Sequence, residues 1–222
     1  MDDYLDLADW RRTVAEMYAA WRHESQADPE RATESLRVKR DDLFRTSSQS
    51  PLHPDNRARF GGLSYFPYDP AYRMNAVVEP VEPVAAAPAG LGLGLSIQLP
   101  ASVTPEFSFR LIGRVQLSGP LAGAALPVFW MAGYAGGLFV PFRDTTSGTD
   151  TYGAGRYLLD TVKGADMGGN WHRRELLLDF NLAYHPSCAY DPKWNCPLAP
   201  PESRLTMPMP VGERLGDPTA SH

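Results

Sequence analysis

Apolar side chains recur at helical spacing near the start of the chain. They fall at intervals of three or four residues, which lines them along one face of a helix: Leu7, Trp10, Val14, Met17 and Trp21. A second helix is expected to begin with Asp28 as its N-cap and Pro29 in its first turn, and to run to about Phe44. These two helices form the first predicted unit, over residues 1–46.

The period of the pattern changes to two after a loop at residues 47–69, where repeated Pro and Gly forbid a long helix. Apolar and polar positions alternate from Tyr72 to Val78 and again from Phe107 to Leu117, which predicts half-buried strands. Shorter strand-like runs lie at 93–99, 125–132, 136–142, 154–162, 174–181 and 204–209. Residues 81–92 are expected to form an exposed, mobile connection.

Many short strands with frequent turns and no intervening helices are typical of an antiparallel architecture. We therefore expect an all-β fold, an antiparallel β-sandwich or partly closed β-barrel, with one or two α-helices at its N-terminus. The β domain would comprise residues 47–222 and carry any functional site, while the helical segment packs against it.

The composition narrows the classes of partner. The net charge of −5 argues against a nucleic-acid or anionic-membrane surface. No apolar run is long enough for a transmembrane helix, and the acidic start of the chain is unlike a secretory signal. Two cysteines without an export signal favour the cytoplasm. The oligomeric state does not follow from the sequence.

Residues 143–157, RDTTSGTDTYGAGRY, form the first candidate for chemistry. Three glycines allow positive φ and open backbone N–H groups, but the segment matches neither a Walker A loop nor a dinucleotide fingerprint. One interpretation is a structured turn held by Asp144 and Thr146. The other places Tyr152 and Arg156 in a pocket, because the planar guanidinium suits a carboxylate, phosphate or carbonyl oxygen. Alternation puts Arg156 opposite Tyr157, either exposed or lining a cavity.

Residues 179–190, DFNLAYHPSCAY, form the second candidate. Asp179 and Asn181 would share one strand face and could meet Arg156, either as a structural anchor or as an acid/base pair. His185 is the general base that residue type suggests, although a hydrogen-bonded loop histidine is the alternative. Tyr184 would supply a polar aromatic wall.

Cys188 and Cys196 are separated by seven residues, outside the spacing of common zinc sites. Their buried, inert packing is favoured over a disulfide, a zinc ligand pair or a nucleophile. No metal ligands are predicted, and no cofactor can be assigned.

Four strings resemble a known family: FGGLSYFPYDPAYRMNA, GGLFVPFRDTTSGTDTYGAGRYLLDT, LDFNLAYHPSCAYDPKWNCPLAPPESRL and the closing VGE. Together they are similar to the bacterial domain-of-unknown-function family 1684, from about Trp10 to Glu213. Here Ser203 stands where the family pattern has Asn, and His185 where many members have Asn. The resemblance implies that the polar motif positions cluster in space: Asp144, Thr146, Gly148, Thr151, Tyr152, Arg156, Asp179, Asn181, Tyr184, Cys188, Tyr190 and Cys196. It implies no activity.

Two functions follow as hypotheses, and whether the protein is an enzyme stays open. In the first, residues 143–204 form a small-molecule site for an anionic or carbonyl-bearing ligand. Its candidate catalytic residues are Asp144, Arg156, Asp179 and His185, and its candidate ligand-binding residues are Thr146, Tyr152, Asn181, Tyr184 and Cys188. In the second, the same polar cluster is a structural network within an interaction or scaffold module. A zinc-stabilised domain is a third alternative.

Overall fold

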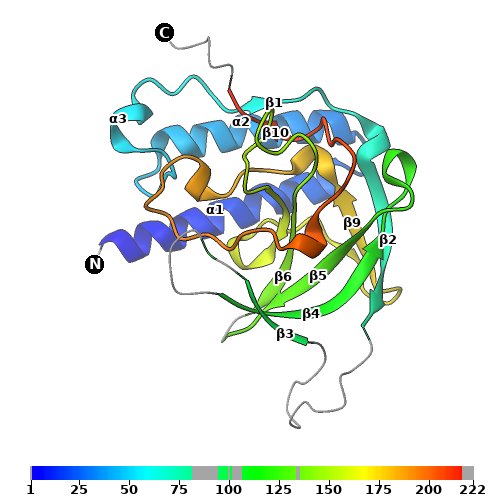
Figure 1. Ribbon diagram of the computed structural model, residues 1–222. Coiled ribbons are helices and arrows are strands. Elements are labelled where there is room, and N and C mark those ends of the chain that lie inside the picture. The colour runs from blue at the N-terminus through cyan, green and yellow to red at the C-terminus, as the bar shows by residue number, and fades with distance from the viewer. Residues whose placement is uncertain (1, 82–94, 100, 102–106, 134–135, 217–222) are drawn as a thin grey trace.

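The computed structural model describes residues 2–81, 95–99, 101, 107–133 and 136–216. Two long helices open the chain, α1 (Asp2–Glu24) and α2 (Pro29–Thr46). Asp28 caps α2 by accepting a hydrogen bond from the Arg31 backbone N–H at 3.1 Å, with Pro29 in the first turn. Both predicted helices are therefore confirmed. Figure 1 shows them side by side and running in opposite directions, against the concave side of a curled sheet.

The main sheet has eight strands in the order β7-β6-β5-β4-β2-β9-β8, with β3 also paired to β4. All its strand pairs are antiparallel. The strands are β2 (Arg73–Pro80), β3 (Leu95–Leu99), β4 (Phe107–Gln116), β5 (Ala125–Met131), β6 (Gly137–Phe142), β7 (Arg156–Asp160), β8 (Gly169–Asn170) and β9 (Glu175–Asp179). The short β1 (Ser64–Tyr65) and β10 (Glu213–Arg214) pair separately.

The sheet curls into a half-barrel. Part of the curl comes from a register shift in β4 between Leu111 and Gly113, which places one extra residue against β5. Only glycine fits at position 113, because a Cβ there would lie 2.6 Å from the Glu79 carbonyl oxygen of β2. The antiparallel prediction holds, but "all-β" is too narrow, since α1 and α2 occupy 23 and 18 residues.

The helices and the sheet share a hydrophobic core. Trp21 of α1 and Leu36 of α2 are buried in the same cluster as Met74 of β2 and Leu178 of β9. A second, smaller cluster of Phe and Leu side chains lies around Phe109 on β4. Since α1 presents the apolar stripe predicted from its spacing to the sheet, the N-terminal segment contributes to the core around which the sheet curls.

The structure differs from the predicted strands in two places. Residues 204–209 form no strand; their one β-bridge joins Arg204 to Arg143. The run at 174–181 stops at Asp179, after which Phe180–Leu182 form a 3-10 helix capped by the Asp179 carboxylate. Asp179 and Asn181 therefore do not share a strand face. The predicted connection at 81–92 lies, beyond Val81, outside the described residues.

The described residues also form one short helix and five further 3-10 turns: α3 (Pro54–Arg57), Pro70–Tyr72, Gly119–Leu121, Thr161–Lys163, Ser187–Ala189 and Pro201–Ser203.

Candidate functional site

Arg156 begins β7 and its side chain is completely buried. Its guanidinium donates to the Asp144 carboxylate at 2.9 Å and to the carbonyl oxygens of Met209, Val211 and Glu213. Burial lowers the pKa of Arg156, and the neighbouring Asp144 opposes that shift. The expectation that Arg156 is exposed or lines a cavity is therefore wrong. Residues 209–213 cover the face of β7 on which Arg156 lies.

The carboxylate of Asp144 accepts several hydrogen bonds besides the one from Arg156. One carboxylate oxygen accepts from the Thr146 N–H at 2.7 Å, the Thr146 hydroxyl at 2.5 Å and the Met209 N–H at 3.3 Å. The Thr146 hydroxyl is also 3.0 Å from that of Thr151. This is the structured turn of the first interpretation, and the Asp144–Arg156 pair ties it to residues 209–213.

Asp179 does not meet Arg156. Asp179 is the last residue of β9, and it forms an ion pair at 3.1 Å with Arg73, its register partner on β2. Asn181 donates to Asp179 at 2.9 Å and exchanges two hydrogen bonds with the backbone of Asp69. Burial raises the pKa of Asp179, while Asn181 and Arg73 act against it. The predicted Asp179–Arg156 contact is thus replaced by two separate buried pairs.

Glu213 lies at the centre of a third buried group that the residue patterns did not reveal. Its carboxylate accepts from Arg40 of α2 at 2.6 Å, from the backbone N–H of His185 at 3.1 Å and from the Tyr190 hydroxyl. Burial by itself would raise the pKa of Glu213, but Arg40, His185 and Tyr190 lower it to about 2. The closing VGE string was the only signal for this residue.

His185 has both ring nitrogens engaged. Nε2 accepts from the Tyr152 backbone N–H at 3.1 Å, and Nδ1 lies 3.3 Å from the Glu213 carboxylate. In these contacts Nε2 accepts a hydrogen bond and Nδ1 faces a carboxylate, to which it can donate. His185 would have to break one of them before it could act as a base.

The two cysteines lie together under the loop that follows His185. Both are buried thiols, and the Cys188 N–H is 3.3 Å from the Cys196 sulfur. The Tyr152 hydroxyl is 3.8 Å from the Cys188 sulfur. The pKa of Cys196 is raised, mainly by a hydrogen bond with the Cys188 thiol and secondly by burial. Thiols in such surroundings are poor nucleophiles.

A cavity of about 70 Å³ adjoins the Glu213 group, between the two long helices and the segment around Tyr184–Tyr190. Its walls are mostly apolar and aromatic: Trp10, Val14, Met17, Tyr18, Leu43, Phe44, Pro51, Tyr157, Ala165, Tyr184, Pro186 and Tyr190. Arg40, His185, Ser187 and Lys163 complete it. The Lys163 side chain is 43% exposed, so one of the lining residues reaches the solvent. Of the predicted site residues, Tyr184 and His185 line this cavity.

Two tyrosine hydroxyls distinguish this cavity from an ordinary gap in the core. Tyr18 is 4% exposed and Tyr184 is largely buried, and both line the cavity. Within the described part of the chain, neither hydroxyl has a hydrogen-bond partner. Neither oxygen is among the fully buried side-chain atoms without a partner, so both hydroxyls open onto the cavity, where a polar ligand atom can hydrogen-bond to them.

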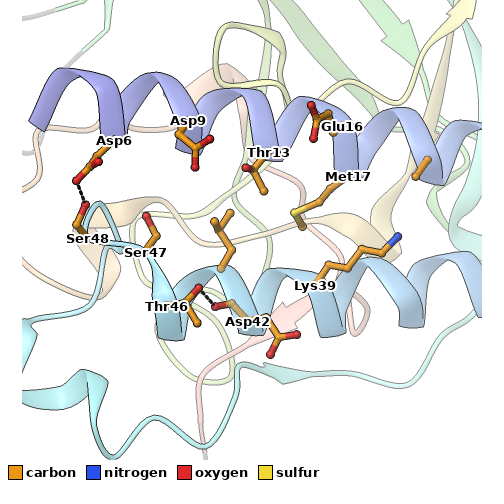
Figure 2. Close-up of a pocket in the computed structure, with 12 residues that line it drawn as sticks. Asp6, Asp9, Thr13, Glu16, Met17, Lys39, Asp42, Thr46, Ser47 and Ser48 are labelled. Carbon is orange, nitrogen blue, oxygen red and sulfur yellow. Dashed lines mark hydrogen bonds between the residues drawn. The ribbon is translucent and has the colours of Figure 1, made fainter. Parts of the chain in front are cut away.

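A second, larger hollow of about 870 Å³ runs between α1 and α2 (Figure 2). Its walls carry several carboxylates, and these already have partners: Asp6 bonds to Ser48, Asp9 pairs with Arg12, and Asp42 pairs with Arg45. This groove therefore has the character of a solvated helix surface.

Neither metal clusters nor membrane spans emerge from the described ranges. No group of three or more potential ligand side chains is placed to hold a metal ion there. None of the helices there is long and apolar enough to cross a membrane.

Comparison with known proteins identifies the family. The model for the protein family of unknown function DUF1684 matches residues 58–214, so the chain belongs to that family. It is also similar to the solution NMR structure of an uncharacterized protein from gene locus rrnAC0354 of Haloarcula marismortui. The two are 32% identical over 90% of this chain and 99% of the other, with a TM-score of 0.60. No curated protein matches.

Proposed function

We propose that this protein binds a small, mainly aromatic molecule with one hydroxyl or carbonyl group in the cavity between α1, α2 and residues 184–190. The observation that supports this most strongly is the pair of hydroxyls without a protein partner, Tyr18 and Tyr184, in a mostly apolar cavity. A few convergent polar groups within apolar walls are the usual form of a small-molecule site. At about 70 Å³ the cavity is smaller than an aromatic ligand needs, so binding requires the side chains that line it to move apart.

The polar residues beside the cavity suit a binding role better than a catalytic one. Arg40, His185 and Tyr190 are all committed to Glu213, which fixes their positions around one wall. A wall preorganised in this way lowers the entropic cost of binding. Among the described residues beside the cavity, no pair of side chains offers a free base next to a free nucleophile. We therefore propose binding without a reaction.

Phenol is a suitable probe because it offers one ring and one hydroxyl. In a titration followed by ¹H–¹⁵N NMR, we expect the amides of residues 184–190 and of the middle of α1 to shift. Losing one hydrogen bond costs roughly 1 kcal/mol, so Tyr18→Phe with Tyr184→Phe should weaken phenol binding about fivefold or more. Tyr4→Phe is the matched control, because Tyr4 lies on the same helix and is 80% exposed.

The proposal fails if phenol produces no shifts in these segments. It also fails if the double variant binds phenol as tightly as the unmodified protein, or if the shifts map to the turn around Asp144.

The alternative, a non-enzymatic interaction or scaffold module, is favoured by one observation. Both terminal nitrogens of Arg156 donate to Asp144 and to three backbone carbonyls, as in a structural network, and only its buried Nε has no protein partner among the described residues. This supports a structural role for that cluster and leaves the cavity to the ligand. The division at residue 46, a cytoplasmic location and a bacterial origin stay predictions from the sequence.

A further inference from the structure

A groove of about 630 Å³, separate from the cavity, lies along β2, β9 and the edge strand β8, beside the end of α1. Alternate residues of a strand share a face, so Arg73 and Asn75 of β2 lie on the same side as Leu177 and Glu175 of β9. Asn75 is paired with Leu177, and Glu175 with Asn170 of β8. These side chains form the floor of the groove.

The walls of the groove come from two distant parts of the chain. Arg22 of α1 lines the groove together with Ser25 and Gln26, which follow the helix directly. Gly168 allows this close approach, because its φ is +78° and a Cβ there would lie 3.0 Å from the Arg22 side chain. Trp171, at the tip of the β8–β9 hairpin and 60% exposed, also lines the groove.

The charges in the groove are nearly balanced. Arg73 pairs with Asp179 at 3.1 Å, and Arg22 donates to the Asp166 carbonyl oxygen and lies 3.9 Å from its carboxylate. Glu175 forms no ion pair within the described residues. The Glu175 carboxylate would therefore repel a phosphate or other strong anion. A neutral ligand with many hydroxyls could instead donate hydrogen bonds to it.

We propose that this groove binds a neutral saccharide. A sugar ring has an apolar C–H face, which matches the flat indole of Trp171, and a rim of hydroxyl groups. Carboxylates accept hydrogen bonds from hydroxyls, guanidinium groups donate them, and the amides of Asn75, Asn170 and Gln26 do both. The volume falls within the range of small-molecule sites.

The test is an NMR titration with glucose, galactose, mannose and N-acetylglucosamine, each to about 50 mM, where millimolar affinity is detectable. At least one sugar should shift the amides of residues 169–177. Trp171→Ala should weaken that binding about tenfold, as expected for an aromatic anchor. Glu175→Gln, which keeps the side-chain shape, should weaken it about threefold. Trp130→Ala is the matched control, since Trp130 is also exposed, at 40%, but lies on β5.

Three results would overturn the proposal. One is that none of the four sugars shifts these amides. Another is that Trp171→Ala and Trp130→Ala bind the sugar equally well. The third is that inorganic phosphate at the same concentration shifts the amides of residues 169–177 more strongly than any sugar. Because the groove and the Tyr18–Tyr184 cavity are separate, none of these outcomes bears on phenol binding.

Discussion

Replacing Asp144 by Asn tests whether the Arg156 cluster is structural. The substitution keeps the shape of the side chain and an oxygen that can still accept from the Thr146 N–H. It removes the negative charge that faces a completely buried guanidinium at 2.9 Å. Removing one partner of a buried pair costs about 3–5 kcal/mol, and the retained acceptor places Asp144→Asn near 3 kcal/mol.

Urea unfolding measures this loss directly. For Asp144→Asn we expect a lower midpoint with an unchanged m-value, because the surface exposed on unfolding stays the same. The chain supplies its own control in the Asp42–Arg45 pair, which has the same chemistry at 2.7 Å but side chains 65% and 46% exposed. Asp42→Asn should cost less than about 0.5 kcal/mol. A loss below about 1 kcal/mol for Asp144→Asn would refute the reasoning.

Three further outcomes are expected. The folded-state pKa of Glu213, about 2, lies below its ordinary value of 4.5, so its ion pair stabilises the fold above about pH 4.5 and that contribution, about 3 kcal/mol, disappears as the pH falls to 2. The difference in unfolding free energy between the unmodified protein and Glu213→Gln should therefore shrink over that window; a constant difference would contradict the assignment. Cys188 and Cys196 should react with a disulfide reagent only after unfolding in urea, because both are buried and the pKa of Cys196 is raised; rapid labelling of the folded protein would count against this. Phe142→Ala should cost about 3–5 kcal/mol in chemical denaturation, since the ring is completely buried against Phe180; a cost near zero would mean that this core is loosely packed.

Local patterns predicted the elements that local physics controls. The apolar stripe of α1, the Asp28–Pro29 start of α2 and the alternation in β2 and β4 all appear in the structure. In each case the spacing of apolar residues decides which face is buried, and burial against the common core then stabilises the element.

The pairing of polar groups depends on contacts that no local pattern contains. Alternation correctly separated Arg156 from Tyr157, but it could not show that residues 209–213 cover the Arg156 face. Arg40 and Glu213 are 173 positions apart, and neither pattern nor charge linked them. Strand β9 ends at Asp179 because the Asp179 carboxylate caps the following 3-10 turn. This local side-chain hydrogen bond competes with continued strand pairing.

The central claim is that the Arg156 cluster is structural and that a ligand binds in the cavity at Tyr18 and Tyr184. Crystals grown with 4-bromophenol test it most directly. The bromine marks the ligand by its anomalous scattering. We predict one strong anomalous peak between α1, α2 and the Tyr184–Tyr190 segment, with the phenol oxygen within hydrogen-bonding distance of Tyr18 or Tyr184. A peak beside Arg156 and Asp144, or no peak in the cavity at saturating 4-bromophenol, would contradict the account.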